Sequence, residues 1–175
     1  MHLERVTDTA HPDYGQAMAL YGISFPEHER REAFSQAKIL SDPAYHFCLI
    51  RDGERFAGLA LYWEDERSLY VEHLCILPQL RNRGYGAGAL GVLKQTGKTV
   101  ILEIDPPVDA LSRRRKGFYR RCGFVENPYA HVHPPYHRGN AGHALVVMTY
   151  PRALSPEEYR TFAKMLRTRV MADAY

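Results

Sequence analysis

The hydrophobic positions in the first forty residues recur at steps of three and four, which is the spacing of one helix face. We predict two short helices here, interrupted at Phe25 and Pro26, where proline disfavours helical backbone. The positions that form the two apolar faces are Ala17, Leu20, Tyr21 and Ser24, and then Ala33, Phe34, Ala37 and Leu40.

From Tyr45 the pattern changes to short apolar runs bounded by turn residues, which is typical of strands. Residues 45–50 and 55–63 are predicted to form a hairpin, because Asp52 and Gly53 favour a tight turn. A third strand begins at Ser68 and ends at Pro78, which has no amide hydrogen for a sheet.

The second half of the chain alternates between helical and strand patterns. We predict a helix over 84–96, a strand over 99–104, a basic helix over 109–122, a loop over 127–143, a strand over 144–150 and a helix over about 155–172. Ser155 and Glu158 form a capping box at the start of the last helix. This order predicts an α/β (α+β) fold with a mixed sheet and a single domain over residues 1–175.

Composition narrows the class of protein. The 175 residues are 45% hydrophobic and 25% charged, no apolar run is long enough for a membrane helix, and no export signal is visible. We therefore expect a soluble, cytoplasmic protein that does not bind membranes. The cysteines Cys48, Cys75 and Cys122 are widely spaced and odd in number, so reduced structural thiols are expected.

A strand, a glycine-rich turn and a helix follow one another between Leu74 and Gly88. Such a turn presents free backbone amides and the positive end of the helix dipole, an arrangement that binds phosphate. Gly84 and Gly86 would let phosphates approach the backbone, and Arg81 and Arg83 add charge. The patterns of nicotinamide-binding proteins and P-loop proteins are both absent; a purely structural reading is that the glycines only allow close helix packing.

Two separated motifs resemble the GNAT superfamily of N-acetyltransferases. Ile76-x-Pro78-x-x-Arg81-x-x-Gly84-x-Gly86 resembles its acetyl-CoA signature, and Phe118-Tyr119-x-x-Cys122-Gly123-Phe124 resembles its second signature. The resemblance covers roughly residues 3–150. It implies a mostly antiparallel sheet of six to seven strands flanked by helices, acetyl-CoA as donor, and a small-molecule or peptide amine as acceptor.

The resemblance also implies roles for individual residues. The pantetheine arm would lie along the backbone of Leu74, Cys75 and Ile76, and Tyr119 would lie near the sulfur as the candidate acid. Ser112 stands where many relatives carry an asparagine that holds the pantetheine. The pyrophosphate would lie on the backbone of Arg81, Asn82, Arg83, Gly84, Tyr85, Gly86 and Ala87.

Acyl transfer to an amine also needs a base and a donor to the developing oxyanion. Because side chains alternate along a strand, Glu72 should share a face with Leu74 and is our candidate base, directly or through water. An amide near Ile76 could serve the oxyanion. The structural alternatives are that Glu72 is a solvated strand residue and that Tyr119 only packs in a core.

Four histidines, His131, His133, His137 and His143, crowd into one loop. Their spacing lacks the regular support of zinc sites, so we expect no metal and place them at the rim of the acceptor pocket. His73 should point to the face opposite Glu72 unless a β-bulge intervenes, and is expected to be buried and satisfied.

The basic residues between Arg113 and Arg121 form either a solvated helix face or a site for an anion, such as a coenzyme phosphate. With a net charge of only +3, nucleic-acid binding through this helix is the less favoured alternative. A non-catalytic acyl-CoA sensor is another. The last helix could cap the sheet or join two subunits; packing on the core is expected, and a homodimer stays open.

Overall fold

Eight strands form one sheet in the computed structural model, which describes residues 1–174. The strand order is β1-β2-β3-β4-β5-β8-β6, and β7 pairs with β8 beside this path. All neighbours are antiparallel except β4 and β5, which are parallel. The strands are β1 (His2–Val6), β2 (Tyr45–Asp52), β3 (Arg55–Glu64), β4 (Ser68–Ile76), β5 (Thr99–Ile104), β6 (Val125–Glu126), β7 (His131–His133) and β8 (His143–Tyr150).

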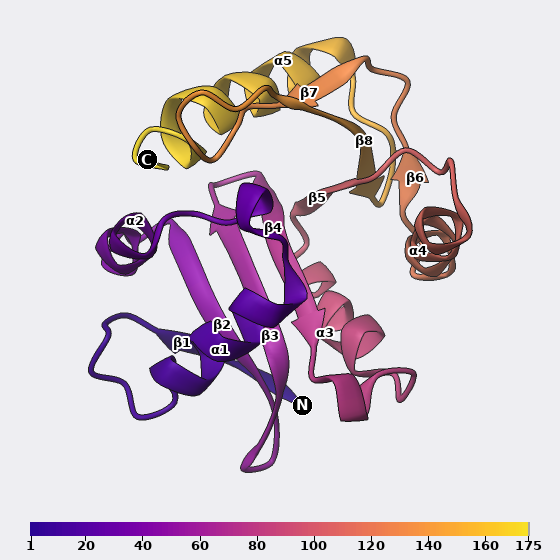
Figure 1. The fold of residues 1–175 in the computed structure, drawn as a ribbon. Helices are drawn as coiled ribbons and strands as arrows, with labels where there is room; N and C mark the ends of the chain where they lie inside the picture. The colour runs from indigo at the N-terminus through magenta and orange to yellow at the C-terminus, as the bar shows by residue number, and fades with distance from the viewer. Residues whose placement is uncertain (175) are drawn as a thin grey trace.

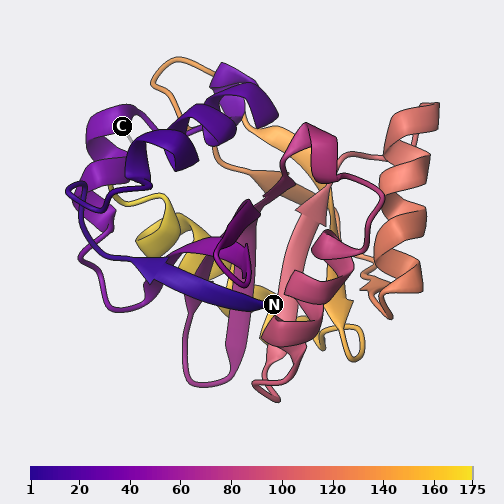
Figure 2. The ribbon, with the colours of Figure 1, turned by 90° about the horizontal axis from the view of Figure 1, so that it is seen from below.

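Helices cover both faces of this sheet (Figures 1 and 2), with α1 on the face opposite α3. The α-helices are α1 (Tyr14–Ser24), α2 (Ala33–Ile39), α3 (Tyr85–Lys94), α4 (Ala110–Arg121) and α5 (Pro156–Met165). Short 3₁₀ turns occupy Glu27–Glu29 and Pro78–Leu80, and a π-helical turn, Leu166–Val170, continues α5.

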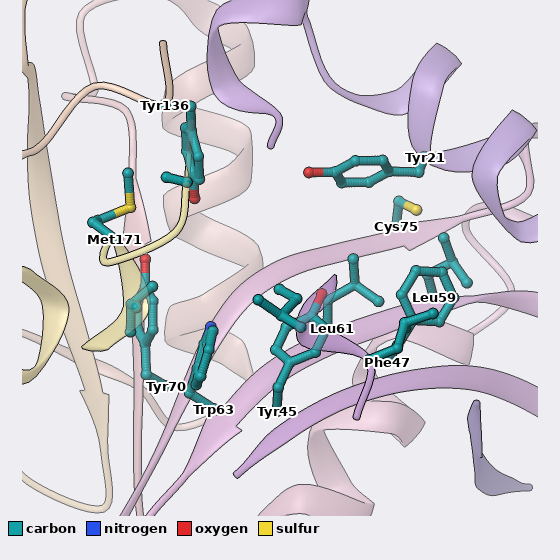
Figure 3. Close-up of a cluster of buried hydrophobic side chains, with 14 of the residues drawn as sticks. Tyr21, Tyr45, Phe47, Leu59, Leu61, Trp63, Tyr70, Cys75, Tyr136 and Met171 are labelled. Carbon is teal, nitrogen blue, oxygen red and sulfur yellow. The ribbon is translucent and has the colours of Figure 1, made fainter. Parts of the chain in front are cut away.

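The core is divided by the sheet. On the α1 side, an aromatic cluster that includes Tyr21, Tyr45, Phe47, Trp63 and Tyr70 packs between the sheet, α1 and the C-terminal helical segment (Figure 3). On the other side, Leu90 and Leu93 of α3 pack with the inward residues of β5 and with Phe124. Fully burying an aliphatic or aromatic side chain stabilises the fold by about 1.5 to 3 kcal/mol, so these two layers hold the helices to the sheet.

The sequence predicted the main elements and the mostly antiparallel mixed sheet correctly. The hairpin turns at Gly53 with φ 57°, and α4 is followed by Gly123 with φ 86°. The strand count is eight rather than six to seven. The sequence analysis assigned no strand to β1, β6 or β7: β1 carries alternating polar residues at a sheet edge, and β6 and β7 have only two and three residues.

The C-terminal helix begins as predicted. Ser155 accepts a hydrogen bond from the Glu158 amide, and the Glu158 carboxylate accepts one in return from the Ser155 amide. Phe162, Leu166 and Val170 are at most 3% exposed and lie in the aromatic core. This helical segment therefore packs on the sheet with its apolar face, as expected.

Cys48, Cys75 and Cys122 are free thiols, the first two of them buried. Among residues 1–174, no helix combines the length and the apolar character that crossing a membrane would require.

Candidate functional site

Strands β4 and β5 separate halfway along their length. They pair only from Ser68 and Thr99 to Val71 and Leu102. Beyond Val71, β4 continues to Ile76 and stays paired with β3 on its other side. Residues 72–76 therefore keep one backbone edge without a strand partner in the described chain, at the point where the sheet opens.

A cleft of about 1240 Å³ lies at this opening. It exceeds the roughly 300 to 1,000 Å³ of common ligand pockets, so it has room for a large ligand or for two reactants. Its walls come from the segment after α1, from β4 and the turn into α3, from the end of β5, from α4, and from the loop between β7 and β8.

The glycine turn forms one end of the cleft. Asn82 and Gly84 adopt positive φ angles of 62° and 84°, which turn the chain sharply into the N-terminus of α3. In the described chain, the amides of residues 82–87 donate no hydrogen bond, and the first helical one is Gly88 to the Gly84 carbonyl at 2.8 Å. The turn thus presents a row of free amides at the positive end of a helix.

The two glycines of this turn, Gly84 and Gly86, have different surroundings. A Cβ at Gly84 would meet nothing within 4 Å, so its glycine is required by the backbone angle. A Cβ at Gly86 would lie 3.4 Å from the Phe118 ring and 3.8 Å from Ile76, which are ordinary packing distances. Close helix packing therefore does not require glycine at either position.

The predicted cofactor residues are largely brought together here. Leu74, Cys75, Ile76, Arg81, Asn82, Gly84, Tyr85, Gly86 and Ala87 all line the cleft. Arg83 is exposed and lies outside the lining. The Tyr85 hydroxyl donates to Asp52 at 2.9 Å, so its ring is drawn toward the β2–β3 turn. The Cys75 side chain lies beside Tyr21 in the core (Figure 3), which leaves its backbone for the cleft.

Ser112 is placed differently from our prediction. Its hydroxyl closes the capping box of α4 with the Asp109 amide at 3.1 Å, and its own amide donates to the Asp109 carboxylate at 2.8 Å. The side chain is buried and does not line the cleft. The expected pantetheine contact at Ser112 is corrected on this ground: the hydroxyl is committed to the helix cap.

The basic helix α4 borders the same end of the cleft. Arg114 donates to Asn82 of the glycine turn at 3.1 Å, and Arg115 pairs with Asp105 at 2.7 Å. On its far side Lys116 pairs with Glu126 at 2.5 Å. Part of the positive charge is thus neutralised. Arg114 and Arg121 line the cleft, whereas Arg113 and Arg120 lie outside its lining.

Tyr119 lines the cleft between these features and packs edge-on against Phe118 and Phe124. Leu74 of the open β4 edge packs on the same cluster. Burial raises the pKa of Tyr119 to about 12, so its hydroxyl stays protonated at neutral pH. The tyrosine is therefore placed as a hydrogen-bond donor beside the open strand edge.

A β-bulge in β4 changes the expected faces. Leu61 of β3 is opposite His73 and the next residue, Tyr62, is opposite Val71, so Glu72 has no partner across the pair. Glu72 and His73 consequently both turn toward the α1 side of the sheet, where they contact Trp63 and Tyr21, while Leu74 packs on the other side. The prediction that Glu72 shares a face with Leu74 is wrong because of this bulge.

Glu72 is held by three side chains. Arg31 pairs with its carboxylate at 3.0 Å, Tyr136 donates at 3.0 Å and Trp63 donates at 2.9 Å, and the carboxylate is fully buried. Burial alone would raise the pKa of Glu72, but the charges of Arg31 and His73 and these hydrogen bonds hold it below its ordinary value. A carboxylate with its oxygens so occupied orders the cleft wall and is a poor proton acceptor.

The sequence analysis did not single out Glu103 of β5. Its buried carboxylate accepts from the Tyr70 hydroxyl at 2.6 Å and bonds His131, and one oxygen lies 3.8 Å from His133 Nε2. Its signal in the sequence is a single carboxylate in an otherwise apolar strand, TVILEI. His137 and His143 lie nearer the surface, beside Glu32 and Asp105.

The expectation that the protein binds no metal stays a prediction. Within residues 1–174, one set of side chains could supply metal ligands: His28, Glu29 and His143, whose donor atoms lie within 4.8 Å of one another at the cleft rim. The four histidines of the loop that follows α4 do not form one such group in that part of the chain: His131 and His133 are buried beside Glu103, and His137 and His143 lie nearer the surface.

Comparison with known proteins agrees with this geometry. The structure is similar to that of a protein from Bacteroides thetaiotaomicron assigned to the GNAT acetyltransferases, with 29% identity, 98% of both chains covered and a TM-score of 0.90. It is also similar in fold to an aminoglycoside 6'-N-acetyltransferase complexed with coenzyme A, with 15% identity, 85% of this chain and 96% of that chain covered, and a TM-score of 0.58.

A ribosomal-protein alanine N-acetyltransferase from Escherichia coli shares the fold at 18% identity, with 89% of this chain and 96% of that chain covered and a TM-score of 0.53. No curated protein matches the sequence. The profile of the acetyltransferase (GNAT) family matches residues 4–124, which is more than half of the chain and includes both sequence motifs. The chain therefore belongs to the GNAT family of acetyltransferases.

Proposed function

We propose that this protein transfers an acetyl group from acetyl-CoA to a primary amine by direct attack within a ternary complex. The observation that carries the proposal is that the free amides of residues 82–87 and the open edge of β4 border one cleft. The amides would bind the pyrophosphate, and the strand edge would pair with the pantetheine arm. Arg114 adds charge at the phosphate end.

The thioester would then lie between the β4 edge and Tyr119. An amide of that edge near Ile76 would donate to the developing oxyanion. Proton transfer from a phenol of pKa about 12 to a thiolate whose acid is near 8.5 is unfavourable, so Tyr119 would stabilise the leaving sulfur mainly by hydrogen bonding.

Tyr119→Phe should lower kcat by about a hundredfold, at the low end of what a positioned proton donor contributes, and leave the Kd for acetyl-CoA unchanged. The substitution removes only the hydroxyl and keeps the ring contacts with Phe118 and Phe124. Steady-state kinetics and a binding titration measure the two quantities. Unchanged kcat in this variant would remove Tyr119 from the mechanism.

The other end of the cleft would take the acceptor. Its walls carry the carboxylates of Glu29, Glu103 and Asp105, of which Asp105 is paired with Arg115 and Glu103 is bonded to Tyr70 and His131. The lining residues from the α1 and β7–β8 segments include no lysine or arginine. Phe25 and Tyr136 supply aromatic surface. Such walls favour a neutral or cationic amine over an acidic acceptor.

Acetyl-CoA at a hundred times its Kd should stabilise the protein by about 2.7 kcal/mol, which is a rise in Tm of about 5 to 10 °C. Gly84→Ala should weaken this binding, because the φ of 84° strains any other residue and relief of that strain would move the free amides. Gly97→Ala is the matched control, because Gly97 also has a positive φ, of 75°, and open space for a Cβ but lies outside the cleft lining.

Thermal-shift titration followed by thiol release with a panel of amines tests the whole proposal. Absence of any shift with acetyl-CoA would contradict it. A shift without acetyl transfer to any amine would instead favour the alternative of a non-catalytic acyl-CoA sensor.

A further inference from the structure

Two buried histidines line the acceptor end of the cleft, His73 on β4 and His133 on β7. Each has one ring nitrogen without a hydrogen-bond partner in the described chain, Nδ1 of His73 and Nε2 of His133. Buried polar atoms are rarely left unpaired, and those that are often belong to reactive sites. These two nitrogens are therefore candidates for the base that Glu72 does not supply.

Backbone carbonyls determine which nitrogen of each ring carries the hydrogen. His73 Nε2 lies 2.8 Å from the Glu29 carbonyl, and His133 Nδ1 lies 2.6 Å from the Pro134 carbonyl. A carbonyl only accepts hydrogen bonds, so each of these nitrogens carries the hydrogen. In its neutral form each ring then presents an unshared electron pair on the other nitrogen.

A neighbouring carboxylate favours His133 over His73 as the base. His133 Nε2 lies 3.8 Å from Glu103, whose negative charge would stabilise the imidazolium formed when His133 takes a proton. The nearest carboxylate to His73 is Glu72, which is already paired with Arg31. Burial lowers the pKa of His73, since its protonated ring would be a buried cation next to that of Arg31.

The other groups around the His133 ring are uncharged, or their charge is neutralised by an ion pair. Its ring stacks on Tyr136 at 4.9 Å, and the Arg31 guanidinium beyond that ring is paired with Glu72. The remaining titratable groups around it are His131 on β7, His143 opposite it on β8, and Tyr70 and His73 on β4.

We propose that His133 is the general base of the acetyl transfer, with Nε2 accepting the amine proton and Glu103 stabilising the resulting imidazolium. The inference rests on the proposed function. The amine nitrogen bonds to the thioester carbon, its proton passes to Nε2, and the carbon–sulfur bond breaks to release the thiolate. The proton on His133 then returns to that thiolate, giving amide and free thiol; an acceptor that arrives as ammonium first loses one proton to solvent.

His133→Ala should lower kcat/KM by about 10² to 10⁴-fold while the Kd for acetyl-CoA stays unchanged, and added imidazole should restore part of the rate. The acceptors would be spermidine, tyramine, kanamycin and a short peptide with a free N-terminus. His2→Gln is the matched control, since this exposed histidine of β1 lies outside the cleft lining and should leave the rate unchanged. His133→Gln, with thermal melting, guards against a loss that reflects only folding.

The neighbouring carboxylate gives a second readout. Glu103→Gln removes the negative charge that stabilises the imidazolium, so kcat/KM should fall while the Kd for acetyl-CoA stays unchanged. An unchanged kcat/KM in Glu103→Gln, or a loss of activity in His73→Asn with full activity in His133→Gln, would overturn the assignment.

Failure of this inference is distinguishable from failure of the proposed function. If His133→Ala retains wild-type turnover, His133 is not the base, but the protein is still an acetyltransferase. If none of the four amines is acetylated, ¹⁵N NMR of the histidine rings still decides: a neutral His133 with the hydrogen on Nδ1 supports the assignment. Hydrogen on Nε2 of the neutral ring contradicts it.

Discussion

Arg31→Met should lower the free energy of unfolding by about 3 to 5 kcal/mol, because it leaves the Glu72 carboxylate as an unpaired charge in the core. The side chains of both residues are fully buried. Burial is costly for a carboxylate in the absence of a cation, and a domain of this size has only about 5 to 15 kcal/mol of stability to lose.

Arg31 also joins three parts of the fold. Its amide donates to the Tyr21 hydroxyl at 3.2 Å, its guanidinium donates to the Val170 carbonyl, and it lies over the Trp63 ring at 5.5 Å. Loss of the side chain therefore loosens the segment before α2, the β4 bulge and the C-terminal turn together.

Urea unfolding monitored by circular dichroism measures the loss. The surface control is Arg152→Met, since Arg152 pairs with Glu158 in an exposed position and exposed pairs contribute little. The double variant Arg31→Met/Glu72→Leu should regain part of the stability, because it removes the unpaired charge but leaves the Trp63 and Tyr136 donors without their acceptor. Recovery of turnover in that variant would exclude Glu72 as the base, and a single-variant loss no larger than that of Arg152→Met would contradict the buried-pair account.

Gly58→Ala should destabilise the protein by about 3 kcal/mol or more and weaken acetyl-CoA binding at the same time. Gly58 is opposite Ile76 in the β3–β4 pair. An added Cβ would lie 2.2 Å from the Cys75 carbonyl oxygen and 2.9 Å from the Ile76 side chain. Because the first of these atoms belongs to the backbone, the clash can be relieved only if β4 moves away from β3 at its open edge.

The matched control is Gly91→Ala in α3, where an added Cβ meets nothing within 4 Å. That substitution should stabilise the protein by about 1 kcal/mol, since alanine favours the helix. Thermal or urea unfolding of the two variants, with acetyl-CoA titration of each, tests the contrast. Equal stability of both variants would mean that β3 and β4 tolerate a wider separation than their contacts indicate.

Local sequence determined the elements and the glycine turn of this protein. The Asp52-Gly53 turn, the capping box at Ser155 and the glycine turn at Gly84 each depend on interactions within a few residues, which a sequence displays directly. The two motifs that resemble the GNAT family are likewise short, contiguous segments, one at the turn into α3 and one at the end of α4. For that reason the fold class could be predicted from the sequence, and most of the predicted cofactor residues line the cleft.

Tertiary structure alone decided which polar side chains meet in the cleft. The bulge at Glu72 depends on how β4 pairs with β3, and it turned the expected base toward Arg31 and brought His73 to the same face. The contact of His133 with Glu103 joins β7 to β5, which are separated in the sequence by α4 and β6. The register in which distant strands pair sets these contacts. A shift of that register by one residue turns every side chain beyond it to the other face of the sheet.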